Sequence, residues 1–308
     1  MRHARARPEP AHQMPGQNVA VDGGRNMDER NEGNGKRIGF VYRPGESPGP
    51  GEPAPSGLAL GDSWFWHGDE TLLHELVNHP AVDPGHGAVR LLGFNGARLN
   101  EYIGDGAFAG VIRMHLEPGF RFSEFYLGGF ANDAFEHRLA LLDDCARAAE
   151  PAACLSPERL DLLLYHIHEG LCGIIRAIRW AYRKTTWQQP IFLNGYDYPI
   201  PDGRGFVRAH GGPVKAIMDD ARIDPDPEFR RAIMKLLIDA INDEVLAGFH
   251  SPLERVLHID SRGTLASSAP DYLDDWDNEI YPSTQGFRKI LEQTWFPRLR
   301  QFGIVTGK

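Results

Sequence analysis

One serine stands where a backbone turn would expose its hydroxyl as a nucleophile. Ser63 follows the short apolar run 58–60 and the pair Gly61-Asp62, at a point where a helix is expected to begin. Open α/β sheets bind their ligands at the carboxyl ends of strands, and the first N–H groups of a helix lack backbone partners. The same residue types also form ordinary turns and helix caps. Ser63 is therefore a candidate nucleophile whose partners must come from the rest of the chain.

Two later loops offer hydrogen-bond donors for an oxyanion, the charged oxygen that forms when a serine attacks an ester carbonyl. Gly96 and Asn132 each follow an apolar run that predicts a strand. The backbone N–H groups of Ser63 and Gly96, together with the side-chain amide of Asn132, are suitable donors. A turn or a helix entry accounts for the glycine and the asparagine equally well.

The elements that would position these residues alternate between strands and helices. Apolar runs predict five strands, at 57–61, 88–94, 122–127, 190–195 and 256–260. The clearest helix begins at the cap Ser156, has Pro157 in its first turn and runs to about Arg183. This alternation predicts a mainly parallel, five-stranded sheet with helices on both faces.

The N-terminal part differs in composition from this body. Residues 1–35 are polar and lack hydrophobic periodicity, 38–42 could form a short strand, and 44–55 are rich in Pro and Gly. We expect a disordered head and linker over 1–56 and one domain over 57–308. The net charge is −9, from 33 basic and 42 acidic residues, so nucleic acid is not an expected partner.

The sequence also indicates a compartment and excludes some kinds of site. Its three cysteines lack zinc-like or redox-like spacing and are expected to be free thiols in a reducing compartment. No apolar stretch approaches the roughly 18 residues of a membrane span, and the basic N-terminus lacks the apolar region of a secretory signal. We expect a cytoplasmic protein that uses no metal and no organic cofactor; the oligomeric state is not predicted.

Five motifs follow one another over residues 57–295: Gly-Asp-Ser-Trp-Phe, Asn-Gly-Ala, Gly-Gly-x-x-Asn-Asp, Gly-Tyr-Asp-Tyr-Pro and Asp-Trp-x-Asn-Glu-Ile-x-Pro-Ser. In this order they resemble the GDSL-type (SGNH) hydrolases, and more narrowly the bacterial subgroup whose first block reads Gly-Asp-Ser-Trp-Phe. The resemblance implies a three-layer α/β/α, flavodoxin-like fold and hydrolysis of a small-molecule ester through an acyl-enzyme. It assigns Ser63 as the nucleophile, Gly96 as the second-block glycine and Asn132 as the oxyanion-hole asparagine.

The chain departs from the family pattern in the last motif and in the third. Tyr281 stands where the family usually has the catalytic histidine, and Asn278 stands three residues earlier, where many members have an aspartate. Phe130 also replaces a usual glycine two residues before Asn132. Because an unperturbed phenol has a pKa of about 10, Tyr281 is a poor general base at neutral pH.

Other side chains are therefore candidates for the base. His67 lies one helical turn after Ser63 and His258 lies on the last predicted strand, although both are also explained as ordinary surface or strand histidines. Asp275 and Asp277 are carboxylates that could act as a weak base or orient one. If none of them serves, the alternative is a catalytically degenerate module that keeps the fold and binds an acyl or glycan ligand.

Overall fold

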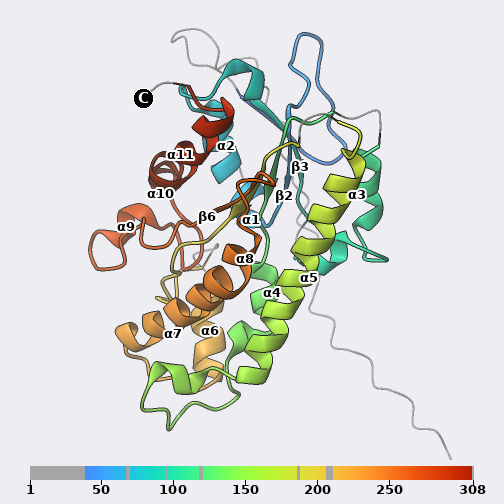
Figure 1. Ribbon diagram of the computed structural model, residues 1–308. Helices are drawn as coiled ribbons and strands as arrows, with labels where there is room; N and C mark the ends of the chain where they lie inside the picture. Colours follow the sequence, from blue (N-terminus) through green and yellow to red (C-terminus); the bar gives the residue numbers. More distant parts are fainter. Residues whose placement is uncertain are drawn as a thin grey trace, which may run out of the picture. The chain divides into compact units, whose positions relative to one another are not determined.

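A six-stranded parallel sheet forms the centre of the part of the chain that the computed structural model describes, residues 39–66, 70–94, 96–117, 121–185, 188–205 and 211–306 (Figure 1). The strands are β1 (Phe40–Tyr42), β2 (Gly57–Leu60), β3 (Ala88–Leu92), β4 (Glu124–Leu127), β5 (Ile191–Asn194) and β6 (Val256–Ile259). Their order across the sheet is β1-β3-β2-β4-β5-β6, and every neighbouring pair is parallel. Strands β2 to β6 thus have the flavodoxin-like order of a doubly wound sheet. The predicted α/β class is confirmed.

The sheet has one strand more than the five that the sequence predicts. The additional strand is β1, which pairs with β3 in the register Phe40↔Ala88 and lies in the segment that the sequence assigns to the head and linker. The Tyr42 side chain at its end is buried, and its hydroxyl donates a 2.9 Å hydrogen bond to the Pro53 carbonyl oxygen. The sequence allows a short strand at 38–42 but does not predict that it joins the sheet, because that depends on its pairing with β3.

Helices cover both faces of the sheet, which gives the predicted three layers (Figure 1). One face carries α2 (Leu72–Asn78), α10 (Thr284–Ile290) and α11 (Phe296–Leu299), and the other carries α3 (Ala109–His115) and α5 (Pro157–Ala181). Helix α5 begins at the predicted cap, where the Ser156 Oγ accepts a 3.3 Å hydrogen bond from the Arg159 backbone N–H. Its buried stripe has the helical period predicted from the sequence and comprises Leu163, Leu164, Ile167, Leu171, Ile174 and Ile178.

A second group of helices lies beyond the carboxyl ends of the strands (Figure 1). It contains α4 (Ala131–Glu136), α6 (Pro213–Asp220) and α7 (Pro227–Ala240), which continues through a π-helical turn into α8 (Ala247–Phe249). The buried carboxylate of Glu279 accepts hydrogen bonds from the backbone N–H groups of Val214 (2.8 Å) and Lys215 (3.0 Å). An anion at a helix N-terminus is stabilised by the unpaired N–H groups there. Glu279 therefore ties α6 to the segment between α9 (Tyr272–Asp275) and α10.

None of the helices in the described ranges combines the length and the apolar character that crossing a membrane requires.

Candidate active site

Three predicted site residues follow three adjacent strands. Ser63 opens the short helix α1 (Ser63–Trp66) after β2, Gly96 follows β3, and Asn132 lies in the first turn of α4 after β4. Since β2 lies between β3 and β4, these three loops meet at one edge of the sheet. The chain turns to opposite sides of β2 here, and such a switch point is where open α/β sheets bind ligands. Gly96 has a φ of +72°, a left-handed conformation that favours glycine.

Side chains of α4 hold the loop after β3 in place. The Asn132 Nδ2 donates a 2.9 Å hydrogen bond to the Ala97 carbonyl oxygen. Next to it, the buried Asp133 carboxylate accepts a 3.1 Å hydrogen bond from the Leu99 backbone N–H. Burial raises the pKa of Asp133 to about 7. The two contacts hold α4 against the loop that carries Gly96, and the Asn132 amide has a second proton beyond the one donated to Ala97.

The turn before Ser63 is fixed by a buried carboxylate. Asp62 accepts hydrogen bonds from the Tyr196 hydroxyl and, at 3.1 Å, from the Trp64 backbone N–H. The Tyr196 hydroxyl in turn accepts a 3.0 Å hydrogen bond from the backbone N–H of Gly129, two residues after the end of β4. Burial raises the pKa of Asp62 above its usual value. Sequence reasoning treats Asp62 only as a turn residue, because its partner Tyr196 lies more than a hundred positions away in the chain.

The indole of Trp64 connects α1 with the segment that carries Tyr281. Its Nε1 donates a 2.7 Å hydrogen bond to the Ile280 carbonyl oxygen, and its ring lies 4.6 Å from the ring of Tyr196. The Asn278 Oδ1 accepts hydrogen bonds from the backbone N–H groups of Ile280 (3.1 Å) and Tyr281 (3.0 Å), which forms the turn before Tyr281. The Trp64 hydrogen bond thus ties the segment that carries Tyr281 to the residue after Ser63.

Tyr281 itself has the environment of a neutral phenol. Its side chain is buried, its ring meets Phe287 edge-on at 5.2 Å, and its hydroxyl donates a 3.4 Å hydrogen bond to the Glu70 carbonyl oxygen. Burial raises its pKa above the usual value of 10, and the nearby carboxylates of Asp62, Asp277 and Glu70 raise it further. At neutral pH the side chain is therefore protonated and cannot accept the proton of Ser63.

Two of the other predicted base candidates, Asp275 and His258, are bound to partners of their own. The fully buried Asp275 carboxylate pairs with Lys289 Nζ at 2.6 Å and accepts the Ala266 backbone N–H at 2.8 Å, so it holds the segment together. His258 lies on β6, three strands from β2, where its Nε2 contacts the Asn242 Oδ1 at 2.9 Å; burial lowers its pKa to about 4. The structure does not bring His258 to Ser63. His67 lies outside the described residues.

Asp277 is the second predicted carboxylate, and its surroundings differ from those of the buried Asp275. Its side chain is exposed and has no hydrogen-bond or ion-pair partner among the described residues, while its backbone N–H donates a 2.9 Å bond to the Tyr281 carbonyl oxygen. Desolvation raises the pKa of Asp277, and the charge of Glu70 adds to the effect. Both changes favour the protonated form and bring the group closer to the pKa range of a useful general base.

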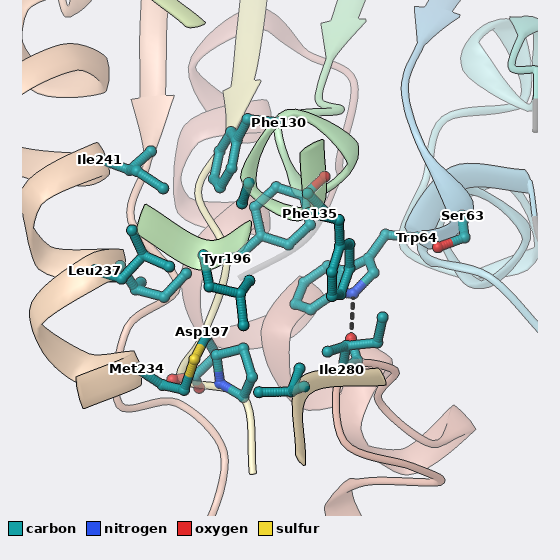
Figure 2. A pocket seen from close by; sticks show the side chains of 16 residues that line it. Ser63, Trp64, Phe130, Phe135, Tyr196, Asp197, Met234, Leu237, Ile241 and Ile280 are labelled. Carbon is teal, nitrogen blue, oxygen red and sulfur yellow. Dashed lines mark hydrogen bonds between the residues drawn. The ribbon is translucent and has the colours of Figure 1, made fainter. Parts of the chain in front are cut away.

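Two hollows adjoin these residues. The first is an apolar chamber that runs from Ser63 past Trp64 to the side chains of α7 (Figure 2). The second is an open, polar hollow of about 420 Å³ lined by Gly96, Arg98, Glu101, Asn132, Phe135 and Glu136. Phe135 lines both hollows, so the two are neighbours; Ser63 lines the first, and Gly96 and Asn132 line the second. In the described part of the chain, no group of three or more His, Cys, Asp or Glu residues is placed to hold a metal ion.

Comparisons with known proteins find similarity only to solved structures. No protein-family profile and no curated protein matches the sequence. The lipase Lip_vut3 from a goat rumen metagenome is 13% identical over 82% of this chain and 99% of its own, with a TM-score of 0.47. An extracellular lipase from Streptomyces rimosus is 16% identical over 80% and 99%, with a TM-score of 0.45. A candidate GDSL-like lipase from Bacteroides ovatus is 12% identical over 83% of this chain with a TM-score of 0.46, and this chain spans 55% of its length.

Proposed function

We propose that the protein is a serine hydrolase that cleaves ester bonds through an acyl-enzyme on Ser63. The observation that supports this proposal is the meeting of Ser63, Gly96 and Asn132 at the switch point of the sheet, beside an apolar chamber. A nucleophile, two oxyanion donors and an adjoining pocket are the parts that acyl transfer needs.

The proposed reaction has two halves. The Ser63 Oγ attacks the ester carbonyl carbon and gives its proton to a base, while the carbonyl oxygen becomes an oxyanion that accepts hydrogen bonds from the Gly96 N–H and the Asn132 amide. The intermediate collapses, the bond to the alcohol oxygen breaks, and the alcohol leaves with the proton held by the base. A water molecule then attacks the acyl-enzyme, its proton passes through the base to the Ser63 oxygen, and the carboxylic acid is released.

We assign the role of base to Asp277, acting directly or through one water molecule. Tyr281 is kept protonated by burial and by its acidic neighbours, and Asp275 is committed to Lys289. Asp277 lies in the same turn as Tyr281 and carries an unpaired, exposed carboxylate whose pKa is raised. A carboxylate of raised pKa is a weaker base than a catalytic histidine but a far better one than a protonated phenol.

The test is the turnover of p-nitrophenyl acetate by the protein and by its Ser63→Ala variant, with Ser267→Ala, an exposed serine outside both hollows, as the matched control. We expect Ser63→Ala to lose at least about 99% of the rate and Ser267→Ala to keep it. Equal rates for the protein and Ser63→Ala would exclude the serine mechanism.

One observation favours a second function, a catalytically degenerate module that binds an acyl or glycan ligand. It is the protonated Tyr281 at the usual histidine position. The Tyr281→His variant separates the two functions. If the protein itself is inactive and Tyr281→His gains Ser63-dependent turnover, the degenerate module is correct. If the protein is active and Asp277→Asn removes the activity, the hydrolase is correct.

A further inference from the structure

The apolar chamber beside Ser63 has a defined beginning and end. Ser63 lies at one end, the side chains of Met234, Leu237 and Ile241 close the other, and Trp64 lies between them (Figure 2). All three closing residues are buried and come from α7 and the turn that follows it. An acyl group attached to the Ser63 oxygen would therefore extend past Trp64 toward α7.

The polar groups that line this chamber are already hydrogen-bonded. The Tyr196 hydroxyl is held by Asp62 and Gly129, and the Trp64 indole N–H by the Ile280 carbonyl. The Asp197 carboxylate accepts the backbone N–H groups of Tyr198 and Gly263 at 2.7 Å and of Leu265 at 2.6 Å. A polar acyl chain would lose its hydrogen bonds to water and find few replacements, so the chamber fits a hydrocarbon chain.

The size of the chamber then limits the length of that chain. Its volume is about 50 Å³, whereas an apolar cavity known to bind benzene has a volume of about 150 Å³. By this scale there is room for about two or three carbon atoms beyond the ester carbonyl. The Trp64 side chain cannot easily move to enlarge the chamber, because it is fixed by its hydrogen bond to Ile280 and by its ring contacts with Tyr196 and Phe287.

We propose that this chamber is the acyl-binding pocket and that it restricts the substrates to esters of short, apolar acyl groups of about two to four carbons. The inference rests on the proposed hydrolase function of Ser63. Leu237 is the residue that sets the limit, since its side chain forms part of the closed end opposite the nucleophile (Figure 2).

The experiment compares kcat/KM for p-nitrophenyl acetate, butyrate and octanoate. We expect octanoate to be at least about tenfold poorer than butyrate, because forcing extra methylenes into a packed interior is unfavourable. Leu237→Ala should raise the octanoate-to-butyrate ratio at least about tenfold. Ile233→Ala is the matched control, since Ile233 is fully buried on the same helix but does not line the chamber; it should leave the ratio unchanged.

Two outcomes would overturn the inference: octanoate turned over as well as butyrate, or the same ratio in Leu237→Ala and Ile233→Ala. A rate that survives in Ser63→Ala would instead contradict the proposed function. In that case, or if no ester is turned over, calorimetric titration with butyrate and octanoate tests the chamber alone. Octanoate binding that is stronger in Leu237→Ala than in the unchanged protein supports the inference, and equal binding overturns it.

Discussion

The indole N–H of Trp64 donates a 2.7 Å hydrogen bond to the carbonyl oxygen of Ile280, across 216 positions of the chain. This single contact joins the residue after the candidate nucleophile to the residue before Tyr281. A side chain of α1 therefore contributes to fixing the last motif relative to the loop that carries Ser63.

Trp64→Phe should loosen this connection. The variant keeps an aromatic ring in the core but leaves the Ile280 carbonyl without its donor, which we expect to lower the free energy of unfolding by about 1–2 kcal/mol. Urea denaturation measures that loss, and esterase assays should show a lower kcat. Trp180→Phe is the control, because Trp180 is 68% exposed and should change stability by less than about 0.5 kcal/mol. Unaltered stability and kcat in Trp64→Phe would show that the contact does not hold the site.

Asp277→Asn should remove the base from the proposed mechanism. We expect kcat/KM to fall roughly 100-fold while the far-ultraviolet circular dichroism stays unchanged, since the side chain is exposed. In the unchanged protein kcat/KM should rise with pH through the raised pKa of Asp277, and this acid limb should disappear in the variant. Asp274→Asn, a nearby exposed aspartate, should keep both the rate and the acid limb. A retained acid limb in Asp277→Asn would assign the base to another group.

Asp133 should make the protein less stable as the pH rises from about 4 to about 7. Its folded pKa of about 7 lies above the usual 3.8, so in this window the folded state binds more protons than the unfolded state and stability falls with pH. The free energy of unfolding should fall by at most about 4 kcal/mol over this window. In Asp133→Asn, which keeps an acceptor for the Leu99 N–H, urea unfolding at pH 4.5 and pH 7.5 should differ less than in the unchanged protein. Asp161→Asn is the control, because Asp161 is an exposed aspartate on α5; it should leave the stability difference between pH 4.5 and pH 7.5 unchanged. If both variants reduced that difference equally, the buried Asp133 carboxyl would not be its cause.

His86, at the other end of the sheet, should also make the protein less stable as the pH rises, but in a higher pH window than Asp133. Its Nδ1 contacts the fully buried Glu124 carboxylate at 2.9 Å, and this hydrogen bond raises the pKa of His86. The stabilisation is complete below the unfolded pKa of about 6.5 and is lost as the pH rises through the higher folded pKa. His86→Ala should therefore cost about 1–2 kcal/mol at pH 6 and less at pH 9, as measured by urea unfolding. His168→Ala, an exposed histidine on α5, serves as the control, and an equal cost of His86→Ala at both pH values would exclude the charged pair.

Local patterns are enough to predict the sheet-forming runs and α5, because a capped, periodic helix such as the one that begins at Ser156 is encoded by neighbouring residues. They are also enough to place Ser63, Gly96 and Asn132 at the ends of strands. Contacts between segments that are distant in the sequence cannot be predicted from such local patterns. Asp275 and Asp277 lie two positions apart in one acidic loop, yet one is fully buried against Lys289 and the other is exposed. Which of them could be a base depends on packing that no local pattern records.

Local patterns also fail to predict which distant residues support the candidate site. Tyr196 is part of the Gly-Tyr-Asp-Tyr-Pro motif, and only the fold shows that its hydroxyl donates to Asp62 and fixes the turn before Ser63. Strand β1 coincides with the possible short strand at 38–42, but its place in the sheet depends on its pairing with β3, which no local pattern records.

The segment around position 281 is held by groups other than the Tyr281 side chain. Trp64 holds the Ile280 carbonyl, Asn278 caps the turn, and Glu279 is bound to the start of α6. Codons for tyrosine and histidine differ by a single base, so one nucleotide substitution would put an imidazole at this position without altering the contacts that fix its backbone. In evolutionary terms, tyrosine and histidine at position 281 are one mutational step apart on a backbone that other residues hold in place.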